Sequence, residues 1–559
     1  MKKLFFLLII LAGFQLNSKA QFSKYIIRLK DKTGTPFSIN NPSQFLSARA
    51  LERRRRQNIL IDETDLPITP AYIDSIRLAG AVTILNKSKW LNQVCIQTTD
   101  SEALLKINSF PFVLSSQPLM RSQSYLPNAN KFNEQIIPTS EPQVLQNISD
   151  YYNYGASYPQ IHIHEGEFLH NNGFRGEGMM LAIMDAGFYQ YKTITAFDSV
   201  RNNNQVVETY DFVNNEVSVD EDNIHGMFCF SIIAANWPGQ LVGSCPKAKF
   251  YLYRTEDVLS ESPVEEQNWA AAAERADSIG VDVFSTSLGY TTFDNSIFDH
   301  TYADMNGNTT IIARACDYAA KKGIISVVAA GNDGNSTWHF ISTPADADSA
   351  VTVGAVNSSG VVAGFSSYGP SGDGEIKPTV ASVGQGSAVA NTNNQPAYGN
   401  GTSFATPNMA GLITCLWQAF PDFTNMEIIE AVKKSSSIYT TPDNRIGYGI
   451  PNFHKAYDDL FQQRALKNVN TILDKDWIKV YPNPFTKNFS VLINPIQTGT
   501  AVLKLYDNVG KLYQTKQFNI QTGQPQFIQF DNLQPLARGI YIMKYSDGAN
   551  KKSIPILGQ

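Results

Sequence analysis

Between residues 151 and 458, short apolar segments alternate with helix-like segments, and this alternation constrains the fold more than any other feature of the chain. The apolar segments include MMLAIMDAG, VDVFSTSLG and GIISVVAAGN, and the helix-like ones include NWAAAAERADSIG and IIARACDYAAKKG. Strands that are apolar throughout are buried on both faces, and helical crossovers join parallel strands. The pattern therefore predicts an α/β domain whose parallel sheet carries helices on both faces.

The flanking regions predict further units. Residues 1–20 combine two lysines, an apolar core and a small-residue exit, which is typical of a secretory signal peptide. Residues 21–125 mix strand-like and helical runs and predict a small α+β domain, whereas residues 474–559 predict a β-sandwich with turns at regular spacing. Two polar stretches, 126–150 and 459–473, are interpreted as linkers.

Composition excludes some classes of partner. Only 17% of the residues are charged and the net charge is -5, so no nucleic-acid partner is expected. No segment after the signal peptide is long and apolar enough to span a membrane, so none is expected in the mature protein. The basic cluster Arg53–Arg56 is interpreted as the solvated face of a helix, with a processing site as the alternative.

The five cysteines predict no disulfide framework. Cys229 and Cys415 lie in apolar helical runs and are expected to be buried thiols. His162, His164 and Glu165 in IHIHEGEFLH are residue types that can bind zinc, but their spacing does not bring them to one face of a strand or helix. No metal site or cofactor is predicted, and a structural calcium ion stays open.

Ser403 stands in GNGTSFATPNMAG, between a glycine-rich run and an expected helix start. In one interpretation, Thr402 or Ser403 caps that helix. In another, Ser403 is a nucleophile at a helix N-terminus, where amide hydrogens favour negative charge. The second interpretation requires a base, an orienting acid and an oxyanion donor elsewhere in the chain.

Three other positions can provide these groups. Asp185 ends the apolar segment LAIMDAG, where a carboxylate can orient an imidazole. His225, followed by Gly226, opens a helical run with a strongly apolar face. Asn332 follows SVVAAG, and its amide can donate to an oxyanion, although Asn-Asp-Gly is also a strong turn signal.

Together, IMDAG, HG, AAGNDG and GTSFATPNMAG resemble, in this order, the signature segments of the subtilisin-like (subtilase, S8 family) serine proteases. The resemblance covers residues 151–458. It implies that Asp185 orients His225, which takes the proton from Ser403. Asn332, with the backbone N–H of Ser403, stabilises the oxyanion. Extended protein or peptide substrates are expected to lie along two segments, Ser287, Leu288 and Gly289, and Ala329, Ala330 and Gly331.

Two departures from the family pattern concern the cleft. Ala186 stands where the family usually has Ser or Thr, so a hydroxyl that could hold Asp185 is missing. The bulky pair Met227 and Phe228 follows the His-Gly pair in place of Thr and His. These departures affect the expected rate and substrate preference and leave the reaction type unchanged.

The flanking regions carry resemblances of their own. Residues 21–125 resemble a subtilase propeptide, with an independent binding domain as the alternative. The tail, with YPNP at its start and GIY in a late strand, resembles the C-terminal sorting domain of the type IX secretion system of Bacteroidetes. The alternative for the tail is a sandwich module that binds carbohydrate or protein. The type IX machinery is thus an expected partner, with export through periplasm and outer membrane to the surface or medium.

The predicted function is a secreted serine endopeptidase that acts through an acyl-enzyme. A catalytically silent subtilase-fold protein that binds peptides or surface partners is the alternative. An esterase that uses the same residues is a third possibility.

Overall fold

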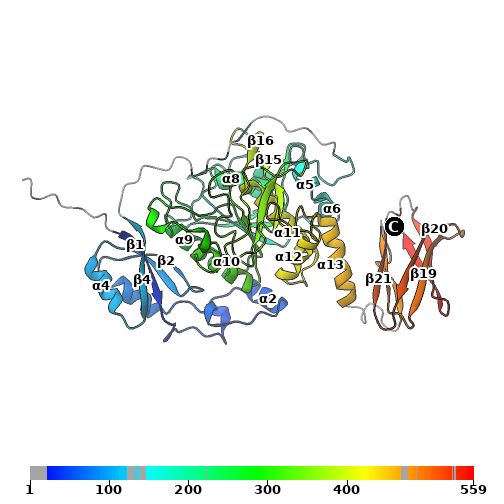
Figure 1. Cartoon of the computed structure of the whole chain (residues 1–559), viewed down its shortest axis with the longest axis horizontal. Coiled ribbons are helices and arrows are strands. Elements are labelled where there is room, and N and C mark those ends of the chain that lie inside the picture. Colours follow the sequence, from blue (N-terminus) through cyan, green and yellow to red (C-terminus); the bar gives the residue numbers. More distant parts are fainter. Residues whose placement is uncertain are drawn as a thin grey trace, which may run out of the picture. The chain divides into compact units, whose positions relative to one another are not determined.

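The computed structural model describes residues 22–121, 131–132, 134, 136–137, 146–221, 223–467, 476–485, 488–531, 533 and 537–558. The predicted signal peptide lies outside these ranges. The chain divides into two units, Met1–Ala456 and Tyr457–Gln559, each of which is described by itself (Figure 1).

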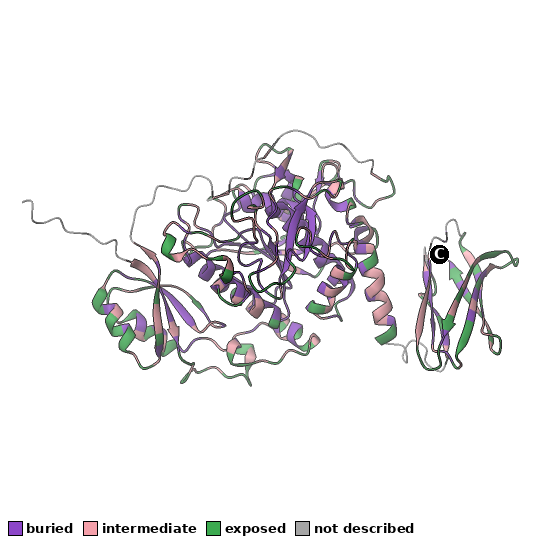
Figure 2. Ribbon diagram, viewed as in Figure 1, coloured by how far each residue is buried: buried purple, intermediate pink, exposed green. Residues whose placement is uncertain are grey.

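A seven-stranded sheet in the order β14-β13-β12-β11-β6-β10-β7 forms the centre of the first unit, and every neighbouring pair is parallel. This confirms the fold class that the strand–helix alternation predicts. Most of its strand residues are buried because helices cover both faces (Figure 2). Its strands are β6 (Met180–Asp185), β7 (Val206–Asp211), β10 (Lys249–Arg254), β11 (Val283–Thr286), β12 (Ile325–Ala329), β13 (Val351–Val356) and β14 (Val380–Val383).

Two pairs of helices cover this sheet. On one face lie α9 (Val264–Ile279) and α10 (Ile311–Lys321), whose small alanines pack closely on Met184, Phe284 and Val328. The buried helices α8 (His225–Ala234) and α11 (Thr402–Ala419) pack against each other and cover the other face.

The shorter elements that the structure describes in this unit are α5 (Tyr158–His162), α6 (Glu167–Asn171), α7 (Asp198–Asn202), α12 (Asn425–Lys434), β5 (Ile136–Ile137), β8 (Asn236–Trp237), β9 (Leu241–Val242), β15 (Gln385–Ala390) and β16 (Pro396–Asn400), with five single 3-10 turns.

The N-terminal region forms an antiparallel sheet in the order β2-β3-β1-β4, consistent with the α+β prediction. One face packs on its own helices, and the other, with Ile26, Cys95 and Leu119, packs on Val264 at the start of α9. The sheet is therefore docked on the helical face of the central domain. Its elements are β1 (Phe22–Leu29), β2 (Thr83–Ser88), β3 (Gln93–Gln97), β4 (Val113–Arg121), α2 (Ala48–Arg56), α3 (Pro70–Arg77) and α4 (Ser101–Ser109).

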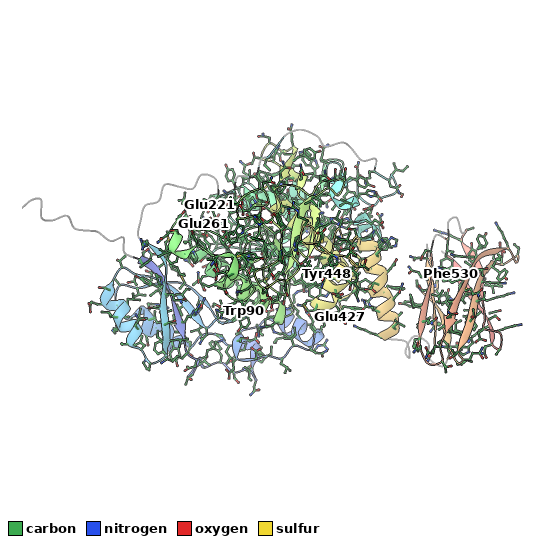
Figure 3. The ribbon with its side chains drawn as sticks, in the orientation of Figure 1. Trp90, Glu221, Glu261, Glu427, Tyr448 and Phe530 are labelled. Atoms are coloured by element: carbon green, nitrogen blue, oxygen red, sulfur yellow. The ribbon has the colours of Figure 1, made fainter. Side chains whose placement is uncertain are left out.

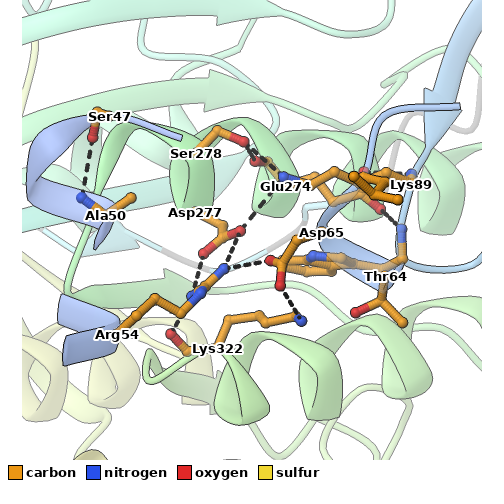
Figure 4. A network of polar contacts seen from close by, with 12 residues as sticks. Ser47, Ala50, Arg54, Thr64, Asp65, Lys89, Glu274, Asp277, Ser278 and Lys322 are labelled. Atoms are coloured by element: carbon orange, nitrogen blue, oxygen red, sulfur yellow. Dashed lines mark hydrogen bonds and ion pairs between the residues drawn. The ribbon is translucent and has the colours of Figure 1, made fainter. Parts of the chain in front are cut away.

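The basic cluster on α2 is not a solvated face, which corrects the sequence interpretation. Arg53 and Arg54 are buried, and both pair with the buried Asp277 near the end of α9. Arg54 also pairs with Asp65 at 2.7 Å and donates to the carbonyl of Lys322 at 2.6 Å (Figure 4). Carbonyls at helix C-termini lack intrahelical donors, so guanidinium groups are favourable there. Arg55 is the member that stays exposed, paired with Glu52.

The second unit contains the tail, whose strands form two antiparallel sheets around one apolar core, consistent with the sandwich prediction. Phe530, labelled in Figure 3, is fully buried in that core. α13 (Phe453–Lys467) runs from the end of the first unit into this one. The strands are β17 (Ile478–Tyr481), β18 (Phe489–Ile493), β19 (Gly499–Asp507), β20 (Leu512–Ile520), β21 (Gln526–Phe530), β22 (Gly539–Ser546) and β23 (Lys551–Gly558).

All five cysteines lie in the described ranges and are free and buried. None of the helices in those ranges combines the length and apolarity that crossing a bilayer requires.

Candidate active site

Asp185 and His225 meet at the carboxyl edge of the sheet. Asp185 is the last residue of β6 and His225 the first of α8, and Asp185 Oδ1 lies 2.6 Å from His225 Nδ1. Both residues are buried. Gly226 permits this approach, because a Cβ there would lie 2.5 Å from the Gly187 carbonyl and 2.9 Å from Asp185 Cβ. The His-Gly pair in the sequence thus has a steric origin.

The absence of a hydroxyl at Ala186 is reflected in the hydrogen bonds of the Asp185 carboxylate. The Ala186 N–H donates to Asp185 Oδ1 at 2.7 Å. Asp185 Oδ2, although buried, has no hydrogen-bond partner among the described residues. Asp185 is therefore held through one oxygen, which fits the expectation that the Ala186 departure removes a support.

Ser403 lies in the first turn of α11 and is 5% exposed. The N-cap residue of α11 is Gly401, and no side chain makes a capping hydrogen bond there. Capping is therefore not the role of Thr402 or Ser403 in this structure. The Ser403 hydroxyl instead donates to Glu134 Oε1 at 2.7 Å.

The Glu134 carboxylate bridges three of the predicted site residues. Besides Ser403, it contacts His225, with Oε2 3.1 Å from Nε2, and accepts from Asn332 Nδ2 at 3.4 Å. Burial alone would raise the pKa of Glu134, but His225 and the hydrogen bond from Ser403 bring it below its usual value. Burial alone would lower the pKa of His225, but Asp185 and Glu134 raise it well above its usual value. The two carboxylates thus favour the protonated form of the imidazole.

Asn332 is oriented by the start of α11. Its Oδ1 accepts from the Thr402 N–H at 2.9 Å and from the Thr402 hydroxyl at 3.0 Å. Because the oxygen is occupied in this way, the amide NH₂ is directed to Glu134, in the cavity that Ser403 also lines. The turn signal in Asn-Asp-Gly and the donor interpretation are compatible, since the turn places this amide at the edge of the sheet.

Glu134 belongs to a segment that crosses the site, and we call its described residues Lys131, Phe132, Glu134, Ile136 and Ile137 the strap. The ring of Phe132 lies against His225, with ring centroids 4.6 Å apart. Farther along, β5 pairs antiparallel with β16, with Ile136 opposite Gly399. The sequence interpretation treated this region as a linker and did not foresee these contacts, because the stretch has no periodicity.

The predicted substrate segments line the cavity beside Ser403, with one exception. The cavity has a volume of about 400 Å³ and is lined by Ser287, Leu288, Gly289, Ala329 and Gly331. Ser287 also donates through its hydroxyl to the Ser403 carbonyl at 2.8 Å. Ala330 is fully buried in the core on the α9 face and is not among the lining residues.

The two histidines of IHIHEGEFLH that could bind zinc by residue type contact protein groups instead. His164 contacts the Pro451 carbonyl and the Ser382 hydroxyl, and His162 contacts Glu167. Within the described residues, Asp185, His225 and Cys229 bring potential ligand atoms within 4.8 Å of one another. Burial raises the pKa of the Cys229 thiol to about 12, however, and Nδ1 of His225 already faces Asp185. This trio is therefore better described as part of the Asp185–His225 pair than as a metal centre.

Three ranges of the chain match known protein families. Residues 24–134 match the peptidase S8 propeptide domain of Bacteroidota, a match that ends at Glu134 in the strap. Residues 176–449 match the subtilase family, and residues 479–557 match a secretion system C-terminal sorting domain. The alternatives of an independent N-terminal binding domain and a ligand-binding tail are thereby set aside.

Curated relatives of the central domain are serine proteases. The thermophilic serine proteinase of Bacillus sp. (strain AK1) is 28% identical over 332 residues, which cover 58% of this chain and 73% of that protein. Subtilisin NAT of Bacillus subtilis subsp. natto is 29% identical over 294 residues, covering 52% and 68%. Serine protease AprX of Bacillus subtilis (strain 168) is 27% identical over 327 residues, covering 53% and 69%. Residues 176–449 thus belong to the subtilase (peptidase S8) family, preceded by a Bacteroidota-type propeptide domain and followed by a secretion sorting domain.

Proposed function

We propose that this protein is a secreted serine endopeptidase, made as a precursor, that cleaves proteins through an acyl-enzyme. The observation that carries the proposal is the single carboxylate of Glu134, which contacts Ser403, His225 and Asn332 together. A group that touches all three occupies the place where a substrate carbonyl would react. The family of the central domain and its serine protease relatives support the same reaction class.

The reaction begins once the Glu134 carboxylate has left the site. Ser403 Oγ then attacks the carbonyl carbon of the scissile peptide bond while His225 Nε2 accepts the hydroxyl proton. Asp185 stabilises the resulting imidazolium through Nδ1. His225 passes the proton to the leaving amine, which yields the acyl-enzyme and the first product. Water, deprotonated by His225, then hydrolyses the ester and frees Ser403.

Asn332 stabilises the negative charge that develops on the carbonyl oxygen. Its amide NH₂ faces the site because Thr402 holds the amide oxygen. A fixed donor of this kind needs no reorganisation when the charge appears, so it favours the transition state over the bound substrate.

Export is proposed from the ends of the chain. The sorting domain supports delivery to the cell surface or the medium. We assign the type IX machinery and the removal of residues 1–20 as the route, which mass spectrometry of both ends of the exported protein tests. A mature N-terminus upstream of residue 21 or an intact tail on the released protein would contradict this route.

Labelling with a fluorophosphonate probe tests the reaction. The probe should modify the processed wild-type protein and leave the Ser403→Ala protein unlabelled, and casein hydrolysis should follow the same pattern. Peptide binding without labelling would favour the silent binding protein, and ester turnover without casein cleavage would favour an esterase.

A further inference from the structure

Three glutamates form a buried pocket on the connection from β10 to α9. Glu256 and Glu261 lie in the loop after β10, and Glu265 in the first turn of α9. The side chains of Glu256 and Glu265 are each 1% exposed and that of Glu261, labelled in Figure 3, is 15% exposed. Since loops after parallel strands gather at one edge of a sheet, this pocket lies at the edge that carries the candidate active site.

Lys131 of the strap fills this pocket. Its Nζ lies 3.4 Å from Glu256 Oε2 and 3.1 Å from Glu261 Oε2, and it donates to Glu265 Oε1. It also donates to the carbonyls of Asp257 and Ser260, at 3.3 and 3.2 Å. Five oxygens therefore surround one ammonium group whose side chain is 7% exposed.

The pocket is held in place without help from the lysine. The backbone N–H groups of Asp257 and Ser262 donate to Glu265 at 2.8 and 2.9 Å. The Tyr290 hydroxyl donates to Glu256 Oε1 at 2.5 Å. Glu256 Oε2 is buried, faces Lys131 and has no hydrogen-bond partner among the described residues. The Lys131 ammonium is therefore the group that compensates this oxygen, and without Lys131 the oxygen would need another cation.

Removal of the strap leaves an acidic pocket beside the reacting groups. Burial raises the pKa of Glu261 to about 7 and that of Glu265 well above its usual range, in each case against the opposing effect of Lys131. Buried carboxylates gathered at one point are unfavourable unless a cation joins them. Glu256 and Glu261 line the same cavity as Ser403 and Asn332, so a substrate that reaches Ser403 can reach this pocket.

The geometry points to a recognition pocket for a lysine side chain of the protein substrate, placed immediately before an apolar residue that packs on His225. Lys131 and Phe132 show this spacing in the strap. The inference rests on the proposed endopeptidase function and specifies its substrate class. Lysine is preferred to arginine, because a compact ammonium fits a cup of five oxygens, whereas a planar guanidinium needs a fork-shaped acceptor.

A set of quenched fluorescent octapeptides tests this inference. The parent is NKFNAQII, the chain's own residues 130–137 with alanine in place of the blocking Glu134, and its lysine is replaced by arginine, norleucine or glutamate. With enzyme processed from the full chain, kcat/KM for the lysine peptide should exceed that for norleucine by about 10–100-fold, since hydrogen bonds to a charged group contribute about 1.5–3 kcal/mol. Arginine should fall between them, and glutamate should be the poorest substrate.

Substitutions in the enzyme test whether the three glutamates are the source of the preference for lysine. Glu261→Gln, at the least buried of the three glutamates, should lower the lysine-to-norleucine ratio about 3–10-fold. Glu208→Gln, a partly exposed glutamate on β7 that pairs with Arg275, serves as the matched control and should leave the ratio unchanged. The ratio compares two substrates within one preparation, so incomplete folding of a variant cannot produce the effect.

The outcomes separate this inference from the proposed function. Equal kcat/KM for lysine and norleucine, or Ser403-dependent casein cleavage without cleavage of any octapeptide, overturns the pocket and leaves the endopeptidase standing. Loss of all Ser403-dependent hydrolysis overturns the endopeptidase. Fluorescence anisotropy with the same peptides then decides the pocket, because lysine must still bind more tightly than norleucine.

Discussion

In this structure the Ser403 hydroxyl donates a hydrogen bond to Glu134 Oε1 at 2.7 Å, and Glu134 Oε2 lies 3.1 Å from Nε2 of His225. The strap carboxylate thus stands between the proposed nucleophile and its base. It engages the hydroxyl and also favours the protonated imidazole, which cannot accept a proton. One side chain therefore blocks both partners of the proposed proton transfer.

Replacing Glu134 by Gln should lower the pKa of His225 in the precursor. The imidazole then loses Glu134, one of the two carboxylates that raise its pKa against the effect of burial, so the pKa falls. NMR titration of the Ser403→Ala precursor measures the shift, with the exposed Glu102→Gln as control. The raised pKa of His225 stabilises the wild-type precursor fully below about pH 6.5, and this stabilisation is lost as the pH rises through the raised value. An unchanged pKa in Glu134→Gln would contradict the bridging contact.

Ser403→Ala and His225→Ala should each lower kcat by about 10⁶-fold, as removal of the catalytic serine or histidine does in subtilisin. The double variant should be scarcely worse than either single one, because the two groups act in one proton transfer. Peptide hydrolysis by processed enzymes, with Cys415→Ala as a buried control outside the site, provides the measurement. Losses that multiply would show that the residues act independently.

Asn332→Ala should lower kcat by about 10²–10³ and leave KM nearly unchanged, as for removal of an oxyanion donor from subtilisin. Thr402→Val should produce a smaller loss in the same direction, because it removes one of the two hydrogen bonds that fix the amide oxygen. Steady-state kinetics of the two variants separate kcat from KM. A rise in KM alone would instead indicate a role in substrate binding.

Arg54→Ala should destabilise the precursor by about 3–5 kcal/mol, since it leaves the buried Asp277 and Asp65 with fewer cationic partners. Arg55→Ala is the matched control one position away. Its exposed ion pair with Glu52 should contribute less than about 1 kcal/mol. Urea unfolding of both variants in the Ser403→Ala background compares them, and equal losses would contradict the buried network of Figure 4.

The same network predicts an acid transition. Burial would raise the pKa of Asp277, but Arg54, Lys89 and Arg53 lower it to about 2 from 3.8. A depressed carboxylate pKa stabilises the folded state above the unfolded value, and this stabilisation of roughly 2 kcal/mol is lost as the pH falls from about 4 to about 2. The stability difference between wild type and Arg54→Ala should therefore be constant from pH 8 to 5 and shrink below pH 4.

The apolar periodicity between residues 151 and 458 was sufficient to predict the parallel sheet, because its strands are buried on both faces. The sequence also indicated where the site residues lie, because each of them ends or follows an apolar strand or begins a helix: Asp185, His225, Asn332 and Ser403. Ala330 was predicted to bind substrate together with its neighbours Ala329 and Gly331. The neighbours line the cavity, but Ala330 is buried in the core, and a prediction made for a whole segment cannot separate the three.

Three features depended on contacts that sequence patterns do not report. From the sequence alone, the arginines of α2 are expected to be solvated. They are buried because they pair with Asp277, which lies 224 positions after Arg53 in the chain. The strap residues are held by contacts with distant parts of the chain, Lys131 with Glu265, Glu134 with Ser403 and Ile136 with Gly399, which no local pattern reports. Glu256, Glu261 and Glu265 after β10 form no recognisable sequence motif, and only their contacts with Lys131 bring them together as one pocket.

The N-terminal domain is attached by the strap across the carboxyl edge of the sheet, by α2 at the C-terminal ends of α9 and α10, and by its own β-sheet, which packs on α9. A cut in the backbone near Glu134 would free the strap and leave the contacts of α2 and of the sheet in place. We therefore expect a freshly cut molecule to remain a noncovalent complex, with cleavage and dissociation as separate events. The delay before full activity would then depend on how slowly the buried arginines and the docked sheet leave the central domain.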